Sequence, residues 1–267
     1  MRVFISADIE GVCGISCWEE ARPREPDYAP FRRQMQLETA AACEAALAAG
    51  ATHVVVKDAH GPARNLRGAE LPAPTQLISG WSGHPFCMVQ NLDESFDAAL
   101  FIGYHGRAGV GGNPLAHTLS SRIVREIRLN GEPASEYRIH AWAAALVGVP
   151  VVFVSGDQTL CDEVARHSPG ARRFVTKWGE GPSQQSVHPQ VAIDGIRDGA
   201  RAALAGDRAA ARLELPQRFT LDVVYKEHAR AYARSFYPGC VQLDPHTIRL
   251  ETDDYFEVLR ALRFVVA

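Results

Sequence analysis

The chain has 267 residues, of which 28 are Lys or Arg and 31 are Asp or Glu, so its formal net charge is −3. This balance excludes the strongly basic surface that is typical of nucleic-acid-binding proteins. Hydrophobic residues make up 46% of the chain and charged residues 22%, which indicates a folded globular protein and excludes a mainly disordered chain or a coiled coil.

The sequence predicts a cytoplasmic protein that has no membrane partner. The apolar stretch Ala141–Gly156 contains Gly148 and Pro150, and it falls short of the roughly 20 apolar residues that cross a bilayer. Asp8 and Glu10 lie where a secretory signal would have its apolar centre. The six cysteines are scattered, without the density of a disulfide-stapled secreted domain, and are expected to be reduced.

Short β-branched runs alternate with helix-compatible segments through most of the chain. Strands are expected at Val3–Ala7, His53–Val56, Ala98–Gly103, Val149–Val154 and Arg173–Thr176. Helices are expected at Phe31–Ala49, Tyr137–Val147 and Pro189–Ala205. This alternation is typical of an α/β fold with a mainly parallel sheet flanked by helices.

The order of elements changes after about Arg212. From there the sequence predicts a strand, a helix, a second strand and a second helix, at Phe219–Tyr225, Glu227–Phe236, Thr247–Glu251 and Tyr255–Arg263. We therefore expect an α/β catalytic domain over residues 1–211 and a small α+β subdomain over residues 212–267.

Polar side chains gather where the first three predicted strands end. Asp8 and Glu10 follow the first strand, Asp58 and His60 end the second, and His105 ends the third, with His117 in the loop beyond. Side chains two positions apart lie on the same side of an extended segment, so the members of each pair can face one point. The carboxyl ends of parallel strands form the ligand crevice of such sheets.

Carboxylates and imidazoles that meet at one sheet edge favour a divalent metal between them. This mixture of ligands suits zinc, with manganese or cobalt as alternatives, and two carboxylates have enough oxygens to bridge two ions. Each residue also has a structural alternative. Asp8 could cap a turn, Asp58 could bind loop amides, and His60 or His105 could be a hydrogen-bonded core histidine.

Other catalytic patterns are absent from the sequence. No G-x-x-x-x-G-K-[ST] segment occurs, and no predicted strand leads into G-x-G-x-x-G, so a phosphate-binding loop is not indicated. The nucleophile pattern G-x-S-x-G is also missing, and Ser155 is expected to lie in a turn.

The order and spacing of several blocks make the chain resemble the DppA-type D-aminopeptidases over nearly its whole length. These blocks are Asp8-Ile9-Glu10-Gly11, Lys57-Asp58-Ala59-His60-Gly61, Arg64-Asn65-Leu66, Phe101-Ile102-Gly103-Tyr104-His105, Leu115-Ala116-His117-Thr118, Asn130-Gly131 with Glu136, Gly148-Val149-Pro150-Val151, Ser155-Gly156-Asp157 and Lys177. The resemblance implies two zinc ions per chain, and the matching ligand positions are Asp8, Glu10, His60, His105 and Glu136. It assigns a catalytic role to His117.

The block around Glu136 departs from the family pattern. Ser135 precedes Glu136 where glycine is expected, and His140 stands where asparagine is expected. Glu136 also has a structural alternative, since an acid in the first turn of a helix is stabilised by the helix dipole. The change at His140 leaves the choice between D- and L-residues open.

The resemblance implies a metal-dependent aminopeptidase that removes the N-terminal residue from short peptides, within a ring-shaped homo-oligomer of two stacked pentamers. Lys177 is a candidate contact for a substrate carboxylate or carbonyl, with a solvated surface lysine as the alternative; no other substrate-binding residue is assigned. Two other functions are weighed. One is an amidase or phosphoesterase with the same ligands, and the other is an assembly protein with a structural metal, which the carboxylate-rich ligand set disfavours.

Overall fold

The computed structural model describes residues 1–266 and contains two sheets. The larger sheet, sheet A, has seven strands in the order β3-β2-β1-β4-β7-β8-β9. Their bounds are β1 Arg2–Ala7, β2 His53–Asp58, β3 Gln76–Ile78, β4 Ala98–Tyr104, β7 Val151–Asp157, β8 Arg172–Glu180 and β9 Ser183–Ser186. All neighbouring pairs are parallel except the β8–β9 hairpin. The predicted α/β class with a mainly parallel sheet is confirmed.

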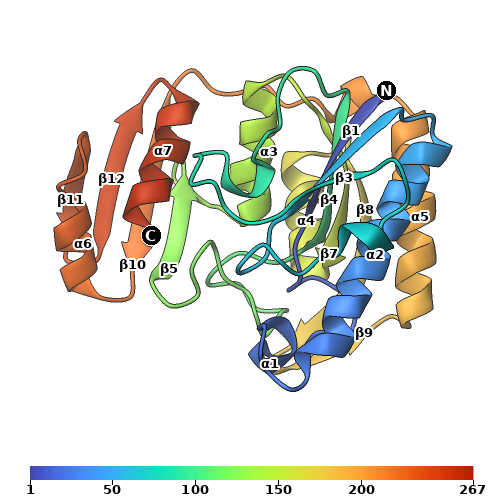
Figure 1. The fold of residues 1–267 in the computed structure, drawn as a ribbon. Helices are drawn as coiled ribbons and strands as arrows, with labels where there is room; N and C mark the ends of the chain where they lie inside the picture. The colour runs from blue at the N-terminus through green and yellow to red at the C-terminus, as the bar shows by residue number, and fades with distance from the viewer. Residues whose placement is uncertain (267) are drawn as a thin grey trace.

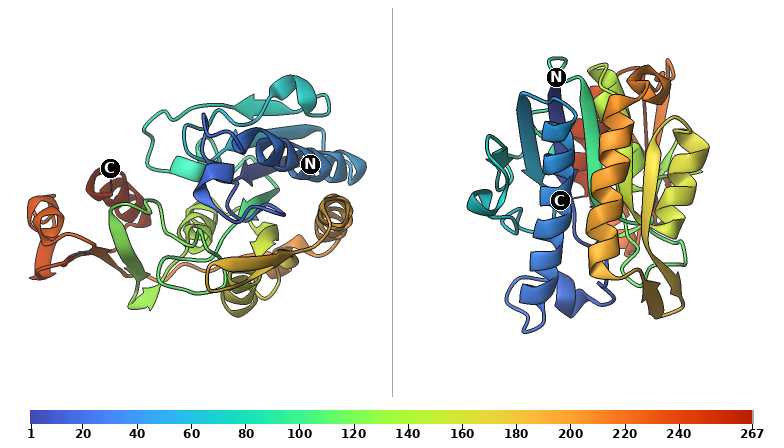
Figure 2. Two further views of the ribbon diagram at one scale, coloured as in Figure 1. Left: turned by 90° about the horizontal axis from the view of Figure 1, so that it is seen from below. Right: turned by 90° about the vertical axis from the view of Figure 1, so that its right-hand side faces the viewer.

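Helices cover both faces of sheet A (Figures 1 and 2). On one face lie α2 (Tyr28–Ala48) and α5 (Pro189–Ala205), which pack side by side over an apolar core that includes Val3, Ile5 and Val54. On the other face lie α3 (Glu136–Leu146) and α4 (Gln158–His167). The sheet is therefore buried on both sides, as its continuous β-branched strands require.

Side-chain caps fix where the helices on the second face begin. Ser135 accepts a hydrogen bond from the backbone N–H of Arg138 at the start of α3, and Asp157 accepts one from the N–H of Leu160 at the start of α4. Such caps satisfy N–H groups that have no partner within the helix. Ser155, expected in a turn, lies inside β7, where its hydroxyl accepts from Gly103 N–H.

The smaller sheet, sheet B, is antiparallel and lies beside the second face of sheet A (Figure 1). Its strands run in the order β11-β12-β10-β5-β6, with bounds β5 Val124–Leu129, β6 Glu132–Pro133, β10 Phe219–Tyr225, β11 Cys240–Asp244 and β12 Thr247–Thr252. The helices α6 (His228–Arg234) and α7 (Tyr255–Val265) complete this part. Three short 3₁₀ turns, at Gly68–Glu70, Cys87–Val89 and Arg208–Ala211, and the four-residue α1 (Trp18–Ala21) lie in the connections.

Sheet B takes strands from both sides of the boundary that the sequence predicts near residue 212. β5 pairs with β10, with Leu129 opposite Leu221 and Ile127 opposite Val223. A division at residue 212 therefore does not separate the two sheets. Sequence patterns do not reveal this pairing, because the partners lie far apart in the chain and the adjacent charged residues Arg125 and Glu126 break the apolar alternation of β5.

The two sheets share one apolar core with α3 and α7. Phe101 and Tyr104 of β4, Tyr137 of α3 and Leu259 of α7 belong to this cluster. The packing fixes α3 and α7 against the carboxyl-end loops of sheet A. Within residues 1–266, no helix combines the length and the apolar character needed to span a bilayer.

Candidate metal centre

The candidate centre lies at the carboxyl end of sheet A, where the strand order reverses. The chain runs from β1 to β2 and β3 on one side of the sheet, and β4 then pairs with the other side of β1. In parallel sheets, ligands bind outside the carboxyl ends of the strands at such a reversal. Asp8 and Glu10 follow β1, His60 follows β2, and His105 follows β4.

A close backbone contact joins the loop after β1 to the end of β4. The N–H of Gly11 donates to the carbonyl of Gly103 over 2.8 Å. A Cβ atom at Gly11 would lie 1.7 Å from the carbonyl oxygen of Tyr104, and one at Gly103 would lie 2.4 Å from the carbonyl oxygen of Asp8. Both positions therefore require glycine, and Gly103 also has a positive φ of 70°.

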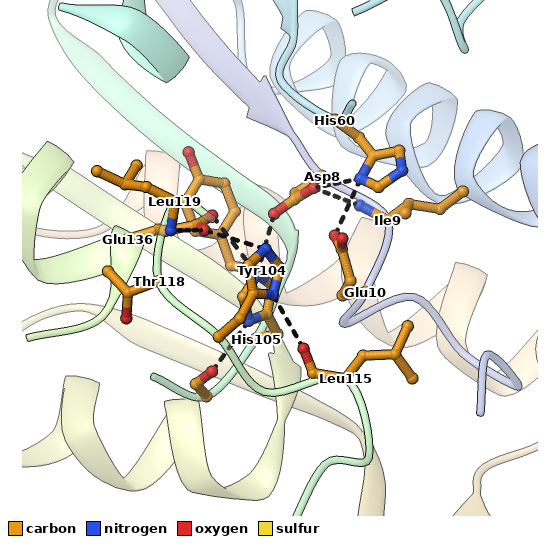
Figure 3. Close-up of polar contacts among 12 residues, drawn as sticks. Asp8, Ile9, Glu10, His60, Tyr104, His105, Leu115, Thr118, Leu119 and Glu136 are labelled. Carbon is orange, nitrogen blue, oxygen red and sulfur yellow. Dashed lines mark hydrogen bonds and ion pairs between the residues drawn. The ribbon is translucent and has the colours of Figure 1, made fainter. Parts of the chain in front are cut away.

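The orientation of His60 leaves one ring nitrogen directed at two carboxylates (Figure 3). Its Nε2 lies 2.7 Å from the carbonyl oxygen of Ala21, which can only accept a hydrogen bond, so Nε2 carries a proton. Its Nδ1 lies 3.1 Å from Oε2 of Glu10 and 3.3 Å from Oδ1 of Asp8. A neutral His60 therefore points a lone pair at two carboxylates, an arrangement that needs a cation.

His105 and His117 are oriented in the same way. Nδ1 of His105 donates to the carbonyl of Gly106, and Nδ1 of His117 donates to that of Leu115, each over 2.9 Å. Nε2 of His105 then faces Asp8 at 3.6 Å and Glu136 at 3.5 Å, and no hydrogen-bond partner satisfies it. Fixing one ring nitrogen on a carbonyl is how proteins orient metal-binding imidazoles.

Asp8 links two groups of candidate ligands. Its Oδ1 faces His60, together with Glu10, and its Oδ2 faces His105, together with Glu136. Ligand atoms of a tetrahedral zinc site lie about 3.3 Å apart, given bonds of roughly 2.0–2.1 Å, and the cluster shows nitrogen–oxygen separations of 3.1–3.6 Å. Glu10, His105 and His117 form a third close group. The donor set fits zinc.

The buried charges shift the pKa values of the cluster strongly. Burial, followed by the neighbouring Glu10, raises the pKa of Asp8 well above its ordinary value. Burial alone would lower the pKa of His105, but Glu136 raises it to about 10. Without a metal, the cluster therefore holds protons in the place of cations.

The centre opens into a cavity of about 490 Å³. The buried acids Asp8, Glu10 and Glu136 and the histidines His60 and His117 line its floor. Its walls come from α1, from the loop over residues 81–90, from the loop over residues 119–122, and from α3 and α7. Sheet A supplies the candidate ligands at the floor, and elements packed against it enclose the space above them.

Comparison with known proteins places this arrangement in a family. A family model described as D-aminopeptidase matches residues 1–264. The chain belongs to the D-aminopeptidase family. The D-aminopeptidase of Bacillus subtilis (strain 168) is 28% identical over 264 residues, which cover 98% of this chain and 95% of the relative. The solved structure of the Zn-dependent D-aminopeptidase DppA from Bacillus subtilis, described as a self-compartmentalizing protease, superposes with a TM-score of 0.93 at 26% identity and covers 100% of this chain and 97% of that chain.

In this D-aminopeptidase family member, Asp58 lies outside the cluster that it was expected to share with His60. Its carboxylate accepts hydrogen bonds from the N–H groups of Asn65 and Leu66 and from the side-chain amide of Asn65, over 2.5–2.8 Å. Asn65 also donates to the carbonyl of His60. Asp58 therefore binds loop amides, the structural alternative, and holds the loop that carries His60.

Lys177 is neither a substrate contact nor a surface lysine. It is 1% exposed, and its Nζ donates to the carbonyls of Glu10 and Ile15 over 2.5 and 2.6 Å. Burial lowers its pKa to about 8. Its role is to hold the loop after β1 from below. The sequence gives no sign of this, because the lysine comes from β8, far from the loop in the chain.

The structure places Glu136 at the first position of α3, between His105 and His117. Its Oε1 accepts from the N–H of Leu119, and its two oxygens lie 3.5 Å from the two imidazoles. His140, one turn later, is buried and lines the cavity, and its Nδ1 donates to the carbonyl of Glu136. The rings of His105 and His117 stack with centroids 4.4 Å apart.

Proposed function

We propose that the chain is a zinc-dependent D-aminopeptidase that removes the N-terminal residue from short peptides. The observation that carries this proposal is the set of three imidazoles, each with one nitrogen fixed on a carbonyl and the other directed at buried carboxylates. The zinc dependence and the activity of the similar B. subtilis protein support it.

Two ions per chain account for the division of ligands around Asp8. In this proposal Glu10 and His60 would hold one ion, His105 and Glu136 would hold the other, and Asp8 would be shared by both groups. Manganese and cobalt are the alternatives to zinc, because imidazole and carboxylate ligands do not discriminate strongly among these metals.

His117 is the proposed proton carrier. Bound metal would supply Lewis-acid polarisation of the scissile carbonyl and lower the pKa of a coordinated water. Because Nδ1 of His117 donates to Leu115, its Nε2, 3.5 Å from Oε1 of Glu136, is the nitrogen that would accept a proton at the floor of the cavity and pass it to the leaving amine. The edge of Trp18 packs on the His117 ring with centroids 5.3 Å apart and limits its rotation.

The assembly and the location are proposed on separate grounds. The similar structure is a self-compartmentalizing protease, and we propose a ring-shaped homo-oligomer, with the decamer of the family as the expected form. On this chain Tyr232, Phe236, Val241 and Leu243 of α6, its C-terminal loop and β11 are 49–71% exposed, an apolar surface suited to subunit contact. The cysteines are all free, which suits a cytoplasmic protein.

Metal analysis and a substrate panel on one purified sample test the proposal. We expect about two equivalents of zinc per chain, cleavage of D-alanyl dipeptides, loss of activity with a chelator, and its return with zinc or manganese. Matched L-dipeptides measure the stereochemical preference, and a phosphate ester tests the phosphoesterase alternative. Full activity in a metal-free sample would contradict the proposal, and so would bound metal without peptide cleavage.

A further inference from the structure

The mouth of the cavity carries three arginines that come from distant parts of the chain. Arg22 follows α1, Arg122 lies in the loop before β5, and Arg263 lies on α7, and all three line the same cavity as the candidate ligands. We call them the rim arginines. All three are exposed, whereas the acids of the floor are 2–4% exposed. The cavity therefore has an acidic floor and a basic rim.

The rim arginines have no carboxylate partner within ion-pair distance among the described residues, whereas eight other arginines of the chain do. The guanidinium of Arg22 stacks on the ring of Trp18, 4.8 Å from its centroid. Arg122 has no such neighbour, and Arg263 lies against Gly83, which has no side chain. Among residues 1–266, the guanidinium groups of Arg122 and Arg263 therefore have no carboxylate partner and can bind an anion at the cavity mouth.

The net charge of the cavity lining indicates the charge of the ligand that it binds. If the proposed function holds, two divalent ions outweigh the three carboxylates of the floor by one unit charge, and the rim adds three more positive charges. The described lining of the loaded cavity then carries a net positive charge. It favours a ligand that has a carboxylate, which guanidinium groups bind through paired, charge-assisted hydrogen bonds.

The size of the cavity indicates which kind of carboxylate-bearing molecule binds there. Its volume of about 490 Å³ suits a small molecule and not a folded chain. An extended residue spans about 3.3–3.6 Å, so the two ends of a dipeptide or tripeptide lie roughly 7–10 Å apart. With the N-terminal residue at the floor, the free C-terminus of such a peptide is directed toward the mouth, where the rim arginines lie.

We propose that Arg122 and Arg263 bind the C-terminal carboxylate of the substrate and thereby restrict this D-aminopeptidase to dipeptides and tripeptides with a free C-terminus. This inference rests on the proposed function for the identity of the substrate. The two arginines thus take the role of substrate-carboxylate contact for which Lys177 was a candidate, since Lys177 is buried below the floor.

The test compares three substrates that differ in whether they have a carboxylate and where it lies. These are D-Ala-D-Ala, its C-terminal amide, and D-alanyl-D-isoglutamine, whose only carboxylate is in the side chain. For the zinc-loaded wild type we expect kcat/KM for the free acid to exceed that for the amide by about 10- to 100-fold, the usual effect of a charge-assisted hydrogen bond. The isoglutamine peptide should behave like the amide.

The double variant Arg122→Gln/Arg263→Gln should lower kcat/KM for the free acid to the value for the amide and leave the amide unchanged. Arg201→Gln is the matched control, because Arg201 is an exposed arginine that pairs with Asp198 on α5, outside the cavity. Equal wild-type rates for acid and amide would overturn the inference. So would a double variant that loses both rates equally, or an isoglutamine peptide cleaved as fast as the free acid.

A binding measurement separates this inference from the proposed function. Ketomethylene analogues of D-Ala-D-Ala have no scissile amide, and calorimetry on the zinc-loaded protein gives their affinities in the acid and amide forms. Tighter binding of the acid, lost in the double variant, supports the inference even if no peptide is cleaved and the proposed function fails. Equal affinities in a protein that cleaves dipeptides would overturn the inference alone.

Discussion

Asp8 and Asp58 lie at the ends of two paired strands, but their carboxylates differ in the hydrogen-bond donors around them. Ala7 is in register with Asp58, so the two acids are close neighbours in sheet A, and both are 0–2% exposed. Asp58 accepts hydrogen bonds from three N–H groups of the Asn65–Leu66 segment. Asp8 accepts one, from Ile9, and otherwise faces imidazole nitrogens and other acids.

The difference shows how a structural acid can be told from a ligand when both are buried. The backbone amides of Asn65 and Leu66 and the side-chain amide of Asn65 satisfy the charge of Asp58, and nothing further is needed there. The charge of Asp8 is left to be balanced by a cation, and the cost of burying it with Glu10 is recovered only when that cation binds. A buried acid without donors therefore marks a binding site more reliably than its residue type does.

Substituting the two acids should give opposite outcomes, and Asp8→Asn should have the largest effect on function. The variant keeps the bond from Ile9 but removes the bridging charge, so activity should fall to background and the zinc content should drop. The metal-free protein should be at least as stable as wild type, because burial beside Glu10 already disfavours the charged form of Asp8. Metal analysis, peptide kinetics and denaturation without metal check this. Full zinc content in the variant would show that Asp8 is not a ligand.

His117→Ala comes next and tests whether a third imidazole of the cluster coordinates metal or moves a proton. If it transfers a proton, kcat should fall by about 10²- to 10⁴-fold, and the zinc content should stay near that of wild type. Activity within a few-fold of wild type would indicate a packing role. Parallel loss of zinc and activity would make His117 a ligand, with one of the five proposed ligands released from that role.

Asp58→Asn should lower the stability of the fold and, through the loop of His60, the affinity for zinc. The new amide places N–H groups against the donors of Asn65 and Leu66, so we expect a loss of about 2–3 kcal/mol in the free energy of unfolding. The loop of His60 loosens, and zinc affinity should fall by roughly 10- to 100-fold, while saturating zinc restores the full metal content. Denaturation and zinc titration measure the two effects. Unchanged stability would contradict the role given to Asp58.

Glu38 of α2 is a third buried acid and should give the smallest effect. One of its oxygens accepts from Cys13 and Gln34, and the other has no partner. Burial raises its pKa from 4.5 to about 7. An acid with a raised folded pKa destabilises the fold as pH rises from the unfolded value through the folded one.

Glu38→Gln should therefore gain stability relative to wild type between pH 4.5 and 7, by about 1–3 kcal/mol at pH 8, and show no gain at pH 4. Denaturation curves with a chelator in every sample remove the contribution of metal binding. The exposed Glu44 of the same helix provides the control, and Glu44→Gln should give parallel pH profiles. A gain that does not change with pH would contradict the assigned pKa.

The sequence predicted those residues of the candidate centre whose positions follow from local patterns. Asp8, Glu10, His60 and His105 each follow a β-branched run, and the rule for parallel sheets brings such positions to one edge. The same rule included Asp58, because spacing cannot show that Asn65 folds back on it. Only the three-dimensional partners separate these cases.

The remaining features depend on contacts between distant segments. Glu136 belongs to a helix, and its residue type alone fits an ordinary first-turn acid, so only the resemblance singled it out. β5 carries charged residues between its apolar ones and becomes a strand by pairing with β10. No local sequence pattern marks the rim arginines. Arg22, Arg122 and Arg263 come to line one cavity only because α7 and two loops pack around it.

The glycine pair Gly11 and Gly103, which joins the loop after β1 to the end of β4, affects how this chain can change during evolution. Neither Gly11 nor Gly103 tolerates a methyl group, since each would strike the backbone of the other segment. The two residues touch no proposed substrate, so exchanging the ligands around them for another chemistry would leave the steric demand in place. We expect glycine at both positions even in descendants that have abandoned peptide cleavage, and the pair would then report common ancestry where catalytic residues no longer do.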